Sequence, residues 1–196
     1  MKKRIRDAEL LFEASFLKKI YRTGYPYLGR GKESVAAHSF GVAFVAWMLC
    51  TMCEKEQGKG VLDREKVLKM ALLHDLPEAR IGDFNAVNKL YDQADEERAL
   101  KEAVSGTLLE EEVVTLWQEY RKGESLEAKL VHDADVIDLL LQLKEHADLG
   151  NPYAPRWIDF ARKRLLTSYG KELATKVLET EWCSWWFEDL VEGNDS

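Results

Sequence analysis

Apolar residues recur every three or four positions along most of this chain, and this spacing restricts its fold more than any other feature. Near the start, Leu10, Leu11, Ala14 and Leu17 form one such stripe. Side chains at these intervals lie on one face of an α-helix. No stretch alternates with a period of two for long enough to predict a strand, and only four prolines and twelve glycines interrupt the 196 residues. We therefore predict an all-α fold, a single-domain helical bundle over residues 1–196.

Capping residues and helix breakers set the expected helix boundaries. Ser34 and Asp63 are suitable N-caps, and Pro77 should kink or end a helix because it lacks a backbone N–H. Residues 83–92 look irregular. The expected helices span residues 7–21, 35–56, 64–76, 94–105, 108–122, 125–148, 155–168 and 170–190.

The last expected helix carries an aromatic cluster. Trp182, Trp185, Trp186 and Phe187 have helical spacing, and such clusters usually pack in a core or an interface. We expect the C-terminal helices, residues 155–190, to complete the core or to form a dimer surface. The exposure of these side chains discriminates between the two.

Composition and charge disfavour several classes of protein. Hydrophobic residues make up 46% of the chain and charged residues 32%, which suits a globular core. The formal net charge is −7 without a large basic cluster, which disfavours nucleic-acid polymers but permits a small anionic ligand. We identify no apolar run approaching the ~18–20 residues that cross a bilayer, so no membrane partner is expected. Charged residues after the basic start also break any signal-peptide core, and we expect a cytoplasmic protein.

Three cysteines do not make a disulfide framework. Cys50 and Cys53 form a CxxC pair, which could be half of a zinc site or a redox pair, but no second pair exists. Both continue an apolar stripe through Ala46 and Leu49. We interpret them as buried free thiols.

Two of the four histidines lie on the apolar stripes of consecutive expected helices. His38 begins one stripe, which continues through Val42, Val45 and Leu49. His74 ends the other, which includes Val67, Met70 and Ala71. A lone inward histidine is more often a core residue than a ligand, but two on neighbouring helices favour a shared role. For His146 we find no acidic partner, and we expect it to be structural or exposed.

Two aspartates complete a candidate metal site. Asp75 directly follows His74, and adjacent helical side chains diverge by ~100°, so the two can straddle one ion. Asp135 is closely flanked by apolar residues, and buried aspartate is rare unless it is paired or metal-bound. We therefore expect His38, His74, Asp75 and Asp135 to bind one divalent ion, whose charge offsets the cost of burying carboxylates. Nitrogen and oxygen ligands without a thiolate suit Mn²⁺, Co²⁺, Ni²⁺, Fe²⁺ or Mg²⁺ more than structural zinc.

A second His-Asp dipeptide, His132-Asp133, lies just before Asp135. We prefer His74-Asp75 as the ligand pair because the preceding Leu72-Leu73 predicts deeper burial for it. His132 is interpreted as a neighbour of the site or a surface residue.

The order His38, His74-Asp75, Asp135 resembles that of the HD-domain phosphohydrolase superfamily. Four blocks in order resemble its 5′-deoxynucleotidase subfamily more specifically: RTGY at 22–25, ESVAAHS at 33–39, HDLPEARIGD at 74–83 and EAKLV at 127–131. The resemblance spans about residues 10–150. Ala37 and Gly31-Lys32 depart from the subfamily pattern, in which an acidic residue and an Arg-Pro pair are usual. Lys32 or Arg30 could replace the positive charge.

The resemblance implies an HD-type bundle and specific roles for further residues. Glu78 would be the catalytic carboxylate, acting on the attacking water or the leaving oxygen, with Asp83 assisting in the same pocket. Arg22 would bind the nucleotide through its phosphate or sugar, and Tyr25 would pack against the sugar or base. The resemblance also implies a homodimer.

The predicted function is metal-dependent hydrolysis of (deoxy)nucleoside 5′-monophosphates to nucleoside and phosphate. One alternative is another HD-type activity: a cyclic phosphodiesterase, a nucleotide triphosphohydrolase or an alarmone hydrolase. The other is a non-catalytic helical module that binds a nucleotide or a protein partner.

Overall fold

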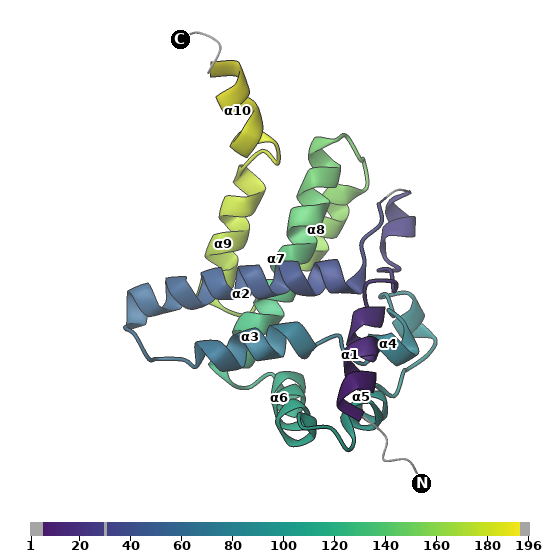
Figure 1. Ribbon diagram of the computed structural model, residues 1–196. Helices are drawn as coiled ribbons and strands as arrows, with labels where there is room; N and C mark the ends of the chain where they lie inside the picture. Colours follow the sequence, from purple (N-terminus) through teal and green to yellow (C-terminus); the bar gives the residue numbers. More distant parts are fainter. Residues whose placement is uncertain (1–5, 30, 193–196) are drawn as a thin grey trace.

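The computed structural model describes residues 6–29 and 31–192, and that part of the chain is helical apart from loops and one isolated bridge between Tyr21 and Ser34 (Figure 1). The all-α prediction is confirmed. The α-helices are α1 (Arg6–Phe16), α2 (Val35–Gln57), α3 (Arg64–Leu73), α4 (Glu78–Ile81), α5 (Glu96–Val104), α6 (Glu110–Lys122), α7 (Leu126–Asp148), α8 (Ala154–Arg162), α9 (Ser168–Glu179) and α10 (Ser184–Glu192). Two 3-10 helices are η1 (Tyr25–Leu28) and η2 (Asn88–Leu90).

Helix α7 is the central element of the fold. It packs against α2, α3, α6, α8 and α9, and its side chains Leu130, Ile137 and Leu140 are fully buried. Burial of such a side chain contributes about 1.5–3 kcal/mol. Most of the buried hydrophobic residues between Leu10 and Ala174 belong to one cluster. Because α2, α3 and α7 pack against one another, polar residues on their facing sides are brought together.

Pro77 separates two helices, as predicted. Helix α3 ends at Leu73, three residues earlier than expected, and residues 74–77 form a turn in which the Leu76 N–H donates to the Leu73 carbonyl at 3.0 Å. The short helix α4, which was not predicted, begins at Glu78. It contacts α1 and α5, and these three helices gather on the right in Figure 1.

The single helix predicted over residues 170–190 is wrong. The chain forms α9 and α10 instead, separated at Thr180, whose backbone is extended with φ −96° and ψ 131°. The Trp182 N–H donates to Asp148 Oδ2 at 3.1 Å, a contact from another helix that local periodicity does not encode. Trp185 is 78% exposed, and Trp182 and Phe187 are also exposed. The aromatic cluster is therefore a surface feature rather than part of the core.

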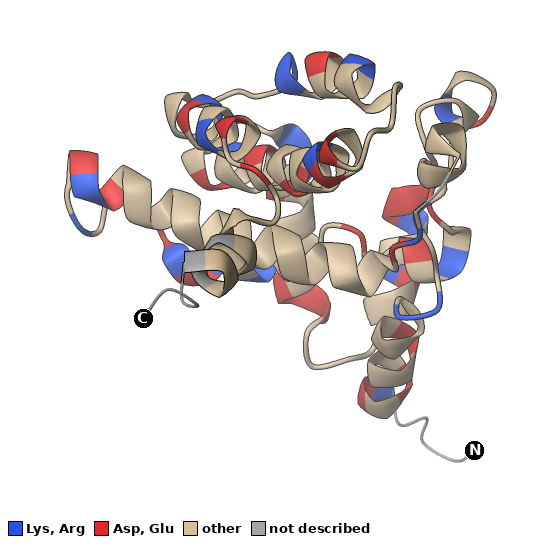
Figure 2. Cartoon of the chain, turned by 90° about the horizontal axis from the view of Figure 1, so that it is seen from above, with Lys and Arg blue, Asp and Glu red and all other residues tan. Residues whose placement is uncertain are grey.

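Helix α2 is more apolar than predicted. Residues 35–53 carry no Asp, Glu, Lys or Arg, and the helix crosses Figure 2 as a long tan segment whose charges lie only at one end. By length and composition it is sufficient to span a membrane, which corrects the statement that no apolar run approaches that length. In this structure 44% of the most apolar 18-residue stretch of α2 is buried. Core helices of soluble proteins can also be this long and apolar. Cys50 and Cys53 lie on the buried side as free thiols, as predicted.

Candidate metal centre and substrate pocket

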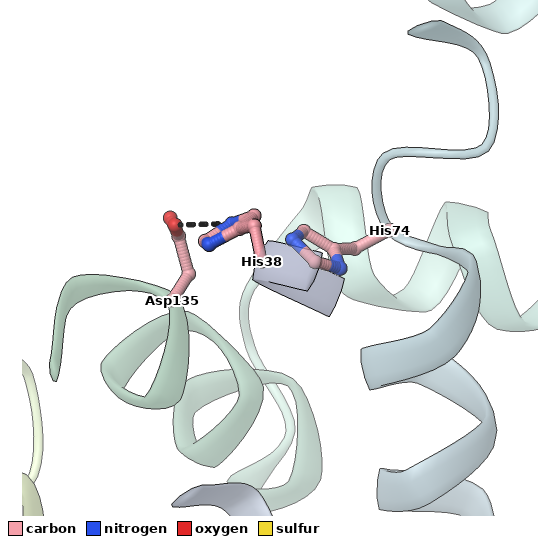
Figure 3. Close-up of side chains that lie close together, drawn as sticks. All are labelled: His38, His74 and Asp135. Carbon is pink, nitrogen blue, oxygen red and sulfur yellow. Dashed lines mark ion pairs between the residues drawn. The ribbon is translucent and has the colours of Figure 1, made fainter. Parts of the chain in front are cut away.

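Three chain segments bring His38, His74, Asp75 and Asp135 to one point. His38 lies on α2, His74 and Asp75 directly follow α3, and Asp135 lies on α7. The His38 Nε2 atom is 3.3 Å from Asp135 Oδ1 and 3.6 Å from Asp75 Oδ2, and the His74 Nε2 atom is 3.3 Å from the same Asp75 oxygen. Figure 3 shows the His38 ring between Asp135 and His74. The predicted set of four therefore converges.

The other ring nitrogens of the two histidines fix the orientation of both imidazoles. His38 Nδ1 is 2.7 Å from Asp138 Oδ2, and His74 Nδ1 is 2.8 Å from the Ala71 carbonyl oxygen. These oxygens accept, so each Nδ1 donates, and a neutral ring then presents its lone pair at Nε2. Both Nε2 atoms are buried and make no hydrogen bond within the described chain. Two such nitrogens facing two carboxylates fit a divalent cation.

The histidines and aspartates of this cluster shift each other's pKa toward the charged forms. Burial alone would raise the pKa of Asp75 and Asp135, but the two histidines outweigh it, lowering the pKa of Asp75 to about 2 and that of Asp135 further. Burial and Arg22 act to lower the pKa of His38, but its contacts with Asp135 and Asp138 raise this pKa to about 10. When no cation is bound, a proton on imidazole therefore compensates the carboxylates.

A cavity of about 350 Å³ opens beside the cluster. Its lining includes Asp75, Asp135 and Glu78, the first residue of α4. The Glu78 Oε2 atom is buried and makes no hydrogen bond within the described chain. Burial and the negative charges of Asp75 and Asp83 raise the pKa of Glu78 to about 9. Glu78 thus faces the same space as the proposed ligands, and without a cation its surroundings favour the protonated carboxyl.

Asp83 holds the loop that carries Arg22 into this cavity. The Asp83 Oδ2 atom accepts from the Thr23 N–H at 2.5 Å and from the Thr23 hydroxyl at 2.7 Å, and Asp83 Oδ1 is 3.9 Å from Arg22 Nε. Burial acts against the charge on Arg22, but Asp135, Asp75 and Asp83 raise its pKa above the ordinary value. The Arg22 Nη1 atom is buried without a hydrogen bond inside the described chain. A charged guanidinium with a free donor in a cavity can bind an anion.

Tyr25 forms part of the cavity wall from η1. Its ring is buried, and its hydroxyl donates to Glu33 Oε2 at 2.7 Å. Burial and Glu33 raise the pKa of this phenol. Because the hydroxyl is already bonded, the ring is the part of Tyr25 that a ligand can contact.

Comparison with known proteins assigns the chain to a family. The HD domain family matches residues 14–174, most of the chain. The chain belongs to the HD-domain family. The family resemblance predicted from the four sequence blocks is therefore confirmed.

Two relatives of this HD-domain protein have the same functional name. A Danio rerio protein named 5′-deoxynucleotidase HDDC2 is 31% identical over 144 residues, covering 69% of this chain and 68% of the relative. A Dictyostelium discoideum protein of the same name is 36% identical over 140 residues, covering 66% and 72%. A crystal structure of a Pyrococcus horikoshii OT3 protein has a TM-score of 0.72 and 32% identity, covering 87% of this chain and 98% of that one. The chain falls in the 5′-deoxynucleotidase subfamily.

The second His-Asp dipeptide of this HD-domain protein has a different environment. Asp133 accepts from the Leu166 N–H at 2.7 Å and from the Thr167 N–H at 2.8 Å, and His132 Nε2 is 3.1 Å from the Arg164 carbonyl oxygen. These bonds hold the segment before α9. The predicted deeper burial of His74-Asp75 holds for the histidines, since His74 is buried and His132 is partly exposed. It fails for the aspartates, since Asp133 is fully buried whereas the Asp75 side chain is 22% exposed. What distinguishes His74-Asp75 is its convergence with His38 and Asp135.

Two charged neighbours of the HD-domain cluster were not predicted. Asp138 bonds to His38 Nδ1, and its position three residues after Asp135 on α7 was a usable sequence signal. Arg164 Nη2 is 3.5 Å from Asp135 Oδ2 and also lines the cavity. No local pattern marks Arg164, because it follows α8 and reaches the site only through the tertiary fold.

The remaining predicted positions lie outside the cluster. His146 is buried, with its ring centroid 6.0 Å from that of Tyr25, in a structural position as expected. Lys32 lies over the Tyr21 ring at 3.8 Å and is not among the described residues that line the cavity. Ala37 is exposed. Arg30 lies outside the described residues.

Proposed function

We propose that this HD-domain protein is a metal-dependent phosphohydrolase that converts (deoxy)nucleoside 5′-monophosphates to nucleoside and phosphate. His38, His74, Asp75 and Asp135 would hold one divalent ion, for which Mn²⁺, Co²⁺, Ni²⁺, Fe²⁺ and Mg²⁺ are suitable. When bound, such an ion supplies Lewis acidity that polarises phosphate oxygens and acidifies water. The pair of buried Nε2 atoms without hydrogen bonds, facing two carboxylates beside a cavity, carries the proposal. The name borne by the relatives supports the substrate class.

Glu78 is proposed as the proton-transfer group. In the reaction, water attacks phosphorus and loses one proton to solvent, the bond from phosphorus to the 5′ oxygen breaks, and that oxygen takes a proton from an acid in the pocket, which solvent then reprotonates. A buried carboxyl group without a hydrogen bond in the described chain, in the lining of the same cavity, is placed to exchange this proton. Of the two roles implied for Glu78, we propose action on the leaving oxygen, and a substrate whose leaving group needs no proton distinguishes it from action on the attacking water.

The other predicted pocket residues divide into contact and positioning roles. Arg22 is proposed to bind the phosphate through its free Nη1 donor. Asp83 is proposed to assist through Thr23, whose loop it holds, rather than by touching the substrate. Tyr25 is proposed to offer its ring to the sugar or base.

Phosphate release from a panel of substrates tests this function. The panel contains deoxy- and ribonucleoside 5′-monophosphates, a cyclic nucleotide, a nucleoside triphosphate and an alarmone, each with added Mn²⁺ or Co²⁺. We expect turnover of the monophosphates, with Asp75→Ala abolishing metal binding and activity together. No turnover of any monophosphate in the presence of metal rejects the proposal, and preferred turnover of another panel member selects the corresponding alternative.

We also propose that residues 1–196 act as one domain and as a cytoplasmic homodimer. The single hydrophobic cluster supports the first point, and three free cysteines suit a reducing compartment. The exposed aromatic residues of α10 offer a surface for the dimer. Light scattering should give a dimer mass that Trp185→Ser lowers and that Tyr91→Ser, a change at another exposed aromatic residue, does not. A monomeric wild-type protein contradicts the dimer.

A further inference from the structure

Helix α8 presents one continuous face to the cavity. Trp157, Phe160, Ala161 and Arg164 all line it, and their spacing of i, i+3, i+4 and i+7 is that of one helix face. Arg164 lies just past the end of α8, where its N–H still donates to the Ala161 carbonyl at 2.9 Å. The helical turn therefore continues far enough to keep Arg164 on this face.

The two ends of the face differ in chemistry. At one end, Arg164 Nη2 is 3.5 Å from Asp135 Oδ2, beside the proposed metal ligands. Trp157 lies two turns earlier, about 10 Å along the axis at 1.5 Å per residue. Its ring rests against the backbone of Gly24, where an added Cβ would lie 3.7 Å from Trp157 Cζ3. Phe160 lies between them and is 63% exposed.

This arrangement matches the shape and polarity of a nucleotide. The separation of Arg164 and Trp157 along the helix is comparable with the reach of a nucleoside 5′-monophosphate from phosphate to base. Aromatic side chains stack on the faces of all bases and discriminate weakly among them. An exposed phenylalanine on a cavity wall gains a favourable contact when a flat apolar ligand covers it.

We propose that α8 provides the nucleobase subsite, in which Trp157 and Phe160 stack on the base while Arg164 contacts the phosphate. The phosphate contact of Arg164 rests on the proposed function, whereas base binding by Trp157 and Phe160 can be tested without it. The subsite accepts purines and pyrimidines alike, because stacking reads no hydrogen-bonding pattern.

Binding of deoxyadenosine, which has a base but no phosphate, tests the aromatic end without turnover. Saturation-transfer NMR should show transfer from the wild-type protein to the base protons, and Phe160→Ala should reduce it strongly. Phe12→Ala, a matched change at an 80% exposed position on α1, should leave it unchanged. Trp157 is half-buried, so Trp157→Phe accompanies Trp157→Ala and should retain transfer. Transfer that is absent from the wild type, or unaffected by Phe160→Ala, overturns the subsite.

Kinetics then separate stacking from a general structural effect. Phe160→Ala should lower kcat/KM for dAMP by about tenfold or more through KM, and leave hydrolysis of 2-deoxyribose 5-phosphate unchanged. Arg164→Gln should reduce both. Equal losses on the two substrates in Phe160→Ala contradict base stacking. If deoxyadenosine binding depends on Phe160 but no monophosphate is hydrolysed, the proposed function fails and the subsite stands.

Discussion

At the residue scale, the proposed reaction depends most on the proton of Glu78. Its pKa, raised to about 9 in the metal-free protein, keeps it protonated below that pH, and a bound cation lowers the value by offsetting Asp75. Glu78→Gln should therefore lower kcat for dAMP by about 10²–10⁴-fold, while calorimetry shows unchanged Mn²⁺ binding. Nitrophenyl phosphate needs no proton on its leaving group and should lose far less. Equal losses on both substrates would instead assign Glu78 to the attacking water.

Asp138 is a positioning residue, because it contacts His38 rather than the substrate pocket. Its carboxylate accepts the His38 Nδ1–H at 2.7 Å and so directs Nε2 toward the proposed ion. Asp138→Asn should weaken Mn²⁺ affinity by about 10–100-fold in a calorimetric titration. Asp159→Asn, at an exposed position on α8 outside the cavity lining, is the control. Unchanged affinity in Asp138→Asn would show that His38 needs no charged partner.

Residues could be predicted where a polar side chain interrupts an apolar stripe. His38, His74 and Asp135 stood out in this way, and Asp75 followed from its place beside His74. Relative burial could not be predicted, because Asp133 is buried by the segment before α9, a contact remote in sequence. Arg164 was missed for the same reason.

At the scale of elements, the close packing of α2 against α7 depends on Gly41. A Cβ at this position would lie 1.9 Å from Asp138 Oδ1, so Asp138 can reach His38 only because residue 41 has no side chain. Although alanine favours an isolated helix by about 1 kcal/mol, Gly41→Ala should destabilise the protein by about 1–3 kcal/mol and weaken Mn²⁺ binding. Chemical denaturation and metal titration measure the two effects.

Gly170 provides the matched control for this prediction. A Cβ there would lie 2.3 Å from Asp133 Oδ2, so Gly170→Ala should also lower the free energy of unfolding. Asp133 bonds to the segment before α9 and not to the metal cluster, so Mn²⁺ affinity should persist. If both variants lose metal affinity equally, general destabilisation explains the effect.

The helices themselves could be predicted where caps and breakers are local. Ser34 and Asp63 cap α2 and α3 with their side chains as expected. No glycine or proline between α9 and α10 predicts that the helix is interrupted there. The hydrogen bond from Trp182 to Asp148 at this break is a tertiary contact, which local sequence does not indicate. The short α4 has four residues, too few to be stable in isolation, so it depends on packing against α1 and α5.

At the scale of the whole molecule, the proposed metal ligands lie on or beside three different helices. Without a bound ion, only the hydrophobic core holds these helices together. His38, His74 and Asp135 come from segments of α2, α3 and α7, which pack against one another. The carboxylates and imidazoles between them are costly to bury, and a divalent cation offsets that cost. Metal binding should therefore stabilise the entire fold rather than one loop.

Thermal unfolding measures this coupling directly. A ligand at 100 times its Kd stabilises the native state by about 2.7 kcal/mol, so Mn²⁺ at that concentration should raise Tm by about 5–10 °C for a chain of this size. EDTA should reverse the shift. Asp75→Ala removes a shared carboxylate and should abolish the metal-dependent shift, while Asp159→Asn should keep it. A full shift in Asp75→Ala would mean that the ion binds elsewhere, because a site that has lost Asp75 cannot join the three segments as tightly.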